Sequence, residues 1–337
     1  MQFSSCMNLA TAALAVCALV TSASAQISVT SPLDGSTKSM PIWMRANVSQ
    51  CNGDSNLTLF GYSIDESPFL TPGKSNTTID SIDYRLSSPG TYQVHFKAWS
   101  QSGQCTGVQS TVTVTGPTTT TDSTVLADSN WKWVFDTGTS GSASGTTSYP
   151  VTSPSEDSQS RKFTMTYTNG GGMRGSTSYA NDINATHFIY DTYVYITNPA
   201  SVQNVEMDTN QVWNQNGDVL ILGLQCAGGS GTWEFTTNVS GKTHWNRSNI
   251  PCNPQTWAAN TWHHVQLITH RDGSGNAFYD SVILDGIKSD FSNAFGNSSY
   301  SLSWSPPGNL VLNFQLDGKG ASGSITAYAD GMTMIRW

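Results

Sequence analysis

The stretch from Asn204 to Trp213 carries the residues best suited to chemistry in this chain of 337 residues. Side chains alternate along an extended strand, so Asn204, Glu206, Asp208 and Asn210 would share one face, and the residues between them the other. Carboxylate and amide groups in consecutive positions on one face can line a groove and bond to the hydroxyl groups of a ligand. This stretch is therefore the candidate site, and a solvated sheet face is the alternative.

The elements that must position this strand are short β-runs separated by Gly, Pro, Asn and Ser. Outside the N-terminus no stretch of about 12 residues shows a convincing helical period, so the sequence predicts an all-β protein. The strands expected after residue 124 are Phe163–Thr168, His187–Ile196, Val205–Trp213, Val219–Cys226, Thr232–Thr237, Trp262–His270, Phe278–Leu284, Leu310–Leu316 and Thr326–Trp337. That many strands in a domain of this size predict a double-sheet jelly roll.

The first 25 residues have the pattern of a signal peptide, because an apolar run over Leu9–Val20 leads into Ala23-Ser24-Ala25. The run is shorter than the ~20 residues of a membrane-spanning helix. We therefore expect an exported protein, secreted, periplasmic or at the cell surface, with no membrane insertion after cleavage before Gln26.

The rest of the chain divides at residues 116–123, where Gly, Pro and Thr predict an extended linker between domains at 26–115 and 124–337. In the first domain the strand Tyr92–Trp99 follows a tight turn at Ser88–Thr91. This arrangement resembles the tyrosine corner of immunoglobulin-type sandwiches. The resemblance implies a bacterial Ig-like β-sandwich that acts as a spacer.

Cleavage of the signal leaves four cysteines, and an even number in an exported chain predicts two disulfides. Of the three possible pairings, the domain division favours Cys51–Cys105 and Cys226–Cys252.

The charge of the chain limits its partners. It has 15 Lys and Arg residues against 23 Asp and Glu residues, a net charge of −8. An acidic chain without basic clusters cannot replace the counterions around nucleic acid or an anionic membrane. We therefore expect no nucleic-acid partner.

Three segments of the second domain carry a family resemblance. Trp262–Val265, Phe278–Gly286 and Tyr328–Ile335 are similar to strands of laminin G-like and pentraxin-like modules in the concanavalin A-like lectin/glucanase superfamily. Together these segments cover most of residues 131–337 by pattern. The resemblance implies a jelly roll whose concave face handles polysaccharide.

The candidate strand also resembles the Glu-x-Asp-x-Glu or Glu-x-Asp-x-x-Glu signature of family-16 and family-7 glycoside hydrolases in this superfamily. The resemblance implies that Glu206 is the nucleophile and that Asp208 orients it. Asn210 and Gln211 stand where the second carboxyl group is needed, and losing the acid/base costs ~10²–10⁴-fold in rate. Hydrolysis would require another acid, such as Glu234 or Asp280.

Sugar binding requires no proton transfer. It requires aromatic side chains that stack on sugar rings and polar groups that bond to hydroxyls. We therefore expect first a polysaccharide-binding protein, second a glycoside hydrolase, and third a structural or adhesion module whose Asn204–Asn210 face is covered. The residues expected to contact sugar, besides the polar strand, are Trp213, Trp233, Trp245, Asn313 and Gln315. Trp131, Trp262 and Trp337 are expected to pack in the core or at an edge.

Two further hypotheses concern lyase chemistry and calcium. His264, Gln266 and Tyr279 could serve a polysaccharide lyase, although the alginate-lyase patterns of this fold are absent. No cofactor is required, but a structural Ca²⁺ could bind Asp330 together with Asp128 or Asp136, if the first and last strands are neighbours.

Overall fold

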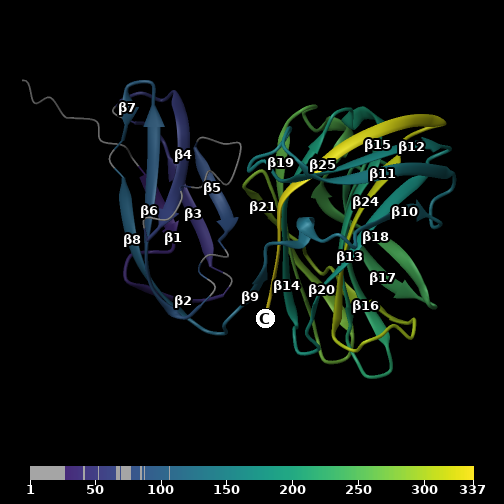
Figure 1. Ribbon diagram of the computed structural model, residues 1–337. Helices are drawn as coiled ribbons and strands as arrows, with labels where there is room; N and C mark the ends of the chain where they lie inside the picture. Colours follow the sequence, from purple (N-terminus) through teal and green to yellow (C-terminus); the bar gives the residue numbers. More distant parts are fainter. Residues whose placement is uncertain are drawn as a thin grey trace, which may run out of the picture.

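The protein is described by a computed structural model over residues 27–40, 42–51, 53–65, 69, 77–83, 86, 88–105 and 107–337. These residues form β-strands and three short 3-10 helices, with no α-helix among them, so the all-β prediction is confirmed. Figure 1 shows two β-sandwiches side by side. The expected signal peptide lies outside the described residues. Within those residues no helix is long and apolar enough to cross a membrane.

The first sandwich pairs a small sheet with a larger one around its own core. The three-stranded sheet is ordered β1 (Ile27–Ser31), β3 (Trp43–Val48), β5 (Thr78–Ile82). The five-stranded sheet is ordered β2 (Ser36–Ser39), β8 (Val108–Thr115), β6 (Gly90–Ser100), β4 (Leu57–Ile64), with β7 (Gly103–Gln104) on β6. The hydroxyl of Tyr92 donates to the carbonyl of Ser88 at 2.8 Å, the hydrogen bond expected of a tyrosine corner.

The second sandwich consists of two larger sheets. The sheet that carries the candidate strand, here called the groove sheet, is ordered β10 (Lys132–Asp136), β13 (Gly172–Asn181), β24 (Asn309–Gly318), β15 (Val202–Val212), β16 (Asp218–Ala227), β17 (Thr232–Val239), β18 (Lys242–Pro251), with β23 (Ser299–Ser301) on β16. The opposite sheet, here called the back sheet, is ordered β11 (Ser142–Val151), β12 (Ser160–Thr168), β25 (Ser322–Arg336), β14 (His187–Ile196), β19 (Trp262–Arg271), β20 (Asn276–Leu284), β21 (Ile287–Asp290), with β22 (Phe295–Asn297) on β20. The 3-10 helices η1 (Val125–Ala127), η2 (Pro199–Ser201) and η3 (Pro254–Thr256) lie in connections.

The core of the second sandwich fixes which face of β15 points outward. Val205 and Met207 are fully buried between the sheets, together with Leu312 and Phe314 of the neighbouring β24. Burying four such side chains contributes several kcal/mol at about 1.5–3 kcal/mol each. A shift of one residue in register would turn these side chains outward, so the core holds the polar face of β15 toward the groove.

Both predicted disulfides are present, Cys51–Cys105 in the first sandwich and Cys226–Cys252 in the second. Bridges of this kind are typical of proteins in oxidising compartments. The expected linker differs from the structure in its second half, where β9 (Thr120–Asp122) pairs with β25 of the back sheet. The guanidinium of Arg336 bonds to the Asp122 carboxylate and anchors this segment.

The first sandwich packs against the outer face of the back sheet. Ile82 of the first sandwich shares an apolar cluster with Ile189, Ile268, Ile283 and Ile335. The Gln266 side chain pairs with the backbone of Ile82, donating to its carbonyl at 3.0 Å and accepting from its N–H at 3.3 Å. The described residues of the first sandwich therefore lie on the side of the second sandwich away from the groove sheet and leave that sheet uncovered (Figure 1).

Candidate functional site

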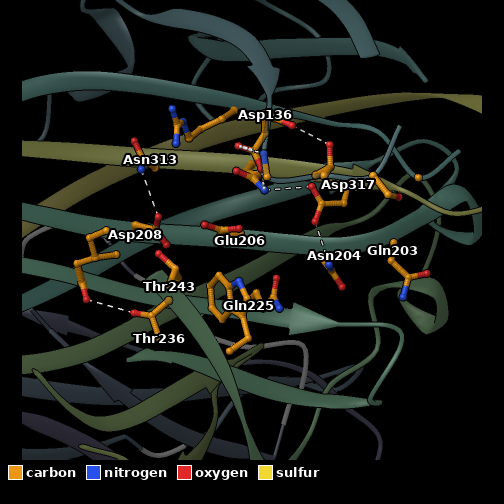
Figure 2. A pocket seen from close by; sticks show the side chains of 18 of the residues that line it. Asp136, Gln203, Asn204, Glu206, Asp208, Gln225, Thr236, Thr243, Asn313 and Asp317 are labelled. Carbon is orange, nitrogen blue, oxygen red and sulfur yellow. Dashed lines mark hydrogen bonds between the residues drawn. The ribbon is translucent and has the colours of Figure 1, made fainter. Parts of the chain in front are cut away.

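Two neighbouring strands of the groove sheet present polar side chains in matching rows. On β15 these are Asn204, Glu206 and Asp208, and their antiparallel partners on β24 are Asp317, Gln315 and Asn313 respectively. Figure 2 shows the labelled members of both rows along the two strands, facing one cavity. Asn210 continues the β15 row toward the end of the strand. The prediction that the four polar residues of β15 share one face is confirmed.

These rows line a cavity of about 760 Å³ on the outer face of the groove sheet. Residues from other strands contribute to its walls, among them Asp136 from β10, Arg174 from β13, Gln225 from β16 and Trp245 from β18. Leu302 and Trp304, from the segment after β23, line it as well, and Trp304 is 41% exposed. The cavity therefore combines a polar floor with exposed aromatic surface.

Hydrogen bonds hold the floor at the Asp317 end. Asn204 Nδ2 donates to Asp317 Oδ2 at 2.9 Å, and Gln315 Nε2 donates to Asp317 Oδ1 at 3.1 Å. Gln315 Nε2 also donates to Asp136 Oδ2 at 3.2 Å. At the other end Asn313 Nδ2 donates to Asp208 Oδ2 at 3.2 Å. These bonds fix the carboxylates before any ligand arrives, which is the condition for specific recognition.

Two glycines leave room for the carboxylates. A Cβ atom at Gly172 would overlap Asp317 Oδ1, and one at Gly223 would lie 2.8 Å from Asp208 Oδ1. Neither glycine has a positive φ. Glycine is therefore needed at these positions because it leaves space beside a carboxylate, and not because the backbone adopts an unusual conformation.

Gly172→Ala is therefore expected to displace the Asp317 carboxylate and to weaken ligand binding by about tenfold or more, since a misplaced polar contact costs about 1–3 kcal/mol. Gly273→Ala is the matched control, because a Cβ atom there meets nothing within 4 Å. Binding isotherms of both variants check this. Equal ligand affinities for the two variants would show that the position of the Asp317 carboxylate does not affect binding.

Burial dominates the electrostatics of the carboxyl groups. Burial, with the charges of Asp208 and Asp317, raises the pKa of Glu206 well above its ordinary value. Burial also raises the pKa of Asp208 to about 6, although Glu206 and Asn313 bond to this carboxylate. For Asp317, burial raises the pKa to about 6 against the opposing hydrogen bonds from Asn204 and Gln315. The floor therefore takes up and releases protons in the weakly acidic range.

Two buried amide oxygens in the cavity lining have no hydrogen-bond partner, Gln225 Oε1 and Asn210 Oδ1. The orientation of Gln225 is fixed, because its Nε2 donates to Glu234 Oε2 at 2.7 Å. A buried acceptor without a partner costs about 1–3 kcal/mol.

The structure corrects one of the expected aromatic contacts and relocates another. Trp233 is 1% exposed and belongs to the core between the sheets, because it alternates with Glu234 on β17 and points inward. Trp213 lies beyond the end of β15, where its Nε1 donates to Ser299 Oγ at 2.7 Å, and it does not line the cavity. Of the three tryptophans expected to contact sugar, only Trp245 lines the cavity.

The candidates for a second catalytic acid lie outside the cavity. Asp280 is on β20 of the back sheet, where its carboxylate bonds to His270 Nδ1 at 2.9 Å. Glu234 is on the groove sheet but is separated from Glu206 by Gln225, and it also faces Arg247 at 3.8 Å. Gln211 faces the other side of the sheet, where its Nε2 donates to the carbonyl of Ala185.

The lyase hypothesis is wrong about a shared site. His264 and Gln266 lie on the outer face of the back sheet, and both bond to Asp191, at 2.6 Å and 2.8 Å. The hydroxyl of Tyr279 is buried inside the sandwich, where it donates to the carbonyl of Thr236 at 2.8 Å. Tyr279 therefore lies on the opposite face of the back sheet from His264 and Gln266, and the three cannot act on one sugar.

The proposed calcium ligands are held by protein donors. Asp330 accepts bonds from Ser155 Oγ and the backbone N–H of Glu156 and Gly331. Asp128 accepts from Thr177, and Asp136 belongs to the groove. In the described ranges no group of three or more His, Cys, Asp or Glu side chains is arranged to hold a metal ion. The calcium hypothesis therefore gains no support from the donor set.

Sequence reasoning missed several residues of the cavity, namely Asp136, Arg174, Gln225, Thr243, Trp304 and Asp317. Asp317 could have been found, because it continues the alternation of Asn313 and Gln315 on β24. The others depend on which strands become neighbours. Arg174 reaches the floor only because β13 pairs with β24, which places it opposite Gln315.

No family model matches the chain, and no curated protein matches it. Solved structures share a similar arrangement at low identity. A structure described as a study of promiscuous carbohydrate-binding modules of the β-sandwich superfamily is 13% identical, with a TM-score of 0.36, over 92% of this chain and 96% of that one. A Bacteroides ovatus GH16 from a mixed-linkage glucan locus, in complex with a G4G4G3G product, is 10% identical, with a TM-score of 0.35, over 64% of this chain and 99% of that one. Lectin II from Ulex europaeus is 12% identical, with a TM-score of 0.30, over 64% of this chain and 97% of that one. At these scores the function must be argued from the site.

Proposed function

We propose that this chain is an exported polysaccharide-binding protein and that the cavity of the groove sheet holds the glycan. The observation that carries the proposal is the pair of polar rows on β15 and β24, whose amide and carboxylate groups face the same cavity as Trp245 and Trp304. Planar side chains stack on sugar rings, and fixed polar groups bond to hydroxyls. The adhesion alternative expected the Asn204–Asn210 face to be covered, whereas this face lines the cavity.

The proposal includes the domain arrangement. The second sandwich would belong to the concanavalin A-like superfamily, and the first would be an Ig-like module that supports it. The isoleucine cluster and the Gln266 contacts hold the two together on the side away from the cavity. A fixed first sandwich could set the distance between the groove and a cell surface without closing the groove.

Affinity electrophoresis tests the proposal. The chain without residues 1–25, as wild type and as Trp245→Ala, is run in gels that contain β-glucan, xyloglucan, galactan, uronan or chitosan. We expect retardation by at least one polymer, and a loss of about fivefold or more in affinity for Trp245→Ala, because stacking contacts are worth about 1 kcal/mol or more. Migration unchanged by every polymer would contradict the proposal.

A second candidate is glycoside hydrolysis. It is favoured by the buried Glu206, because a carboxyl group with a strongly raised pKa inside a cavity is suited to proton transfer. A raised pKa at Glu206 fits a general acid better than the nucleophile that the family resemblance implies. An assay for new reducing ends with wild type and Glu206→Gln decides the matter. New ends that disappear in the variant would make the chain an enzyme, and binding without new ends would leave it a binding protein.

A further inference from the structure

The charge of the cavity restricts the kind of glycan that it can hold. Its lining contains four carboxyl groups, those of Asp136, Glu206, Asp208 and Asp317, and one cationic group, that of Arg174. Three of the carboxyl residues, all except Asp136, are at least nine-tenths buried, whereas Arg174 is exposed to solvent. The field inside the cavity is therefore set by acids, because an exposed guanidinium is screened.

The hydrogen-bonding groups of the floor also restrict the kind of glycan that the cavity can hold. Gln225 is 4% exposed and Asn210 is 3% exposed, and the oxygen of each has no partner. The bond from the Gln225 nitrogen to Glu234 fixes this side chain, and both Gln225 and Asn210 line the cavity. Carboxylates and amide oxygens both accept hydrogen bonds, so the floor favours a ligand that carries hydrogen-bond donors.

An ammonium group meets both requirements. It has three donors, no acceptor and a positive charge, whereas a hydroxyl has one donor and no charge, and a uronate adds negative charge. We propose that the cavity selects an amino sugar with a free ammonium group, as in a glucosamine polymer, over its acetylated, neutral and uronic counterparts. The inference rests on the proposed function, since it names the class of glycan held in that same cavity.

A proton linkage follows from this arrangement. A cation beside Asp208 and Asp317 favours their charged forms and lowers their pKa values from about 6. Binding of an ammonium at pH 6 should therefore release protons from the protein. A neutral sugar changes these ionisations much less.

Three hexasaccharides with the same β-1,4 backbone separate the possibilities, because they differ only at carbon 2: glucosamine (ammonium), N-acetylglucosamine (acetamide) and glucose (hydroxyl). Calorimetric titration of the wild type at pH 6 should give an affinity for the glucosamine hexamer about tenfold or more above the other two, the gain expected of about 1.4 kcal/mol. The preference should shrink as salt is raised. Titration in two buffers of different ionisation enthalpy should show proton release for glucosamine alone.

Variants test whether the carboxylates cause the preference. Asp208→Asn and Asp136→Asn are expected to reduce the affinity for the glucosamine hexamer by a larger factor than that for the glucose hexamer, so the ratio of the two affinities should fall toward one. Two positions are used so that a folding defect at one leaves the other informative. Asp272→Asn is the control, since Asp272 lies outside the cavity lining.

Each outcome has a defined meaning. Equal affinity for the three hexamers, or tighter binding of a uronic acid oligomer, would overturn the amino-sugar inference and leave glycan binding intact. Binding of none of these oligomers, together with the unchanged migration described above, would contradict the proposed function itself.

Discussion

Replacing Trp233 by alanine is expected to lower the free energy of unfolding by about 3–5 kcal/mol. Its indole is 1% exposed and lies in the core between the two sheets, so truncation removes apolar burial and leaves a cavity. Trp245→Ala is the matched variant on the neighbouring strand β18, where the side chain lines the groove. Its free energy of unfolding should change by less than about 1 kcal/mol, while its glycan affinity falls.

Urea-induced unfolding followed by far-UV circular dichroism measures both effects, and titration with glycan measures the affinity. A large loss of stability in Trp245→Ala with a stable Trp233→Ala would contradict the assignment of the two side chains. The comparison therefore tests directly which tryptophan packs the core and which faces a ligand.

The second large effect concerns stability against pH. The folded-state pKa of Asp317 is about 6, whereas an unfolded aspartate has a pKa of about 3.9. Because the folded value is the higher one, the stabilisation from protonated Asp317 is fully present below pH 4 and is lost as pH rises through 6. At about 1.4 kcal/mol for each pKa unit, the loss amounts to about 3 kcal/mol between pH 4 and pH 7.

Asp317→Asn should remove this part of the pH dependence, so the free energy of unfolding of the variant should fall by about 3 kcal/mol less than that of the wild type over the same range. Asp272→Asn is the control. Burial raises the pKa of Asp272, but hydrogen bonds from Asn276 and Ser274 outweigh this effect and lower it. The contribution of Asp272 to the free energy of unfolding therefore changes only below pH 4. Parallel curves for the wild type and Asp317→Asn would show that Asp317 does not titrate as described.

Strand alternation predicted much of the fold. The strand His187–Ile196 has the expected bounds, and the polar face of β15 was found from the alternation of four polar residues with Val205 and Met207. Both disulfides followed from the division of the chain into two parts. These features are local, or depend on one boundary, so a single sequence contains them.

Strands rich in Gly, Ser and Thr were missed, notably β11 and β13, because they lack apolar alternation and their pairing depends on neighbours. The residues that those strands deliver were missed with them. The error at Trp233 has a different cause. Its alternation with Glu234 on β17 indicates the inner face, whereas its aromatic side chain alone suggests stacking on a sugar ring. Residue type alone does not tell a core tryptophan from a groove tryptophan.

The central claim, that the cavity on the groove sheet holds a glycan, is tested most directly by a crystal structure of the chain with the oligosaccharide that binds best. We expect sugar rings over β15 and β24, with hydroxyl or ammonium groups bonded to Asp208, Gln225 and Asp317 and one ring against Trp245. A sugar bound to the back sheet or to the first sandwich, with this cavity free of it, would contradict the account.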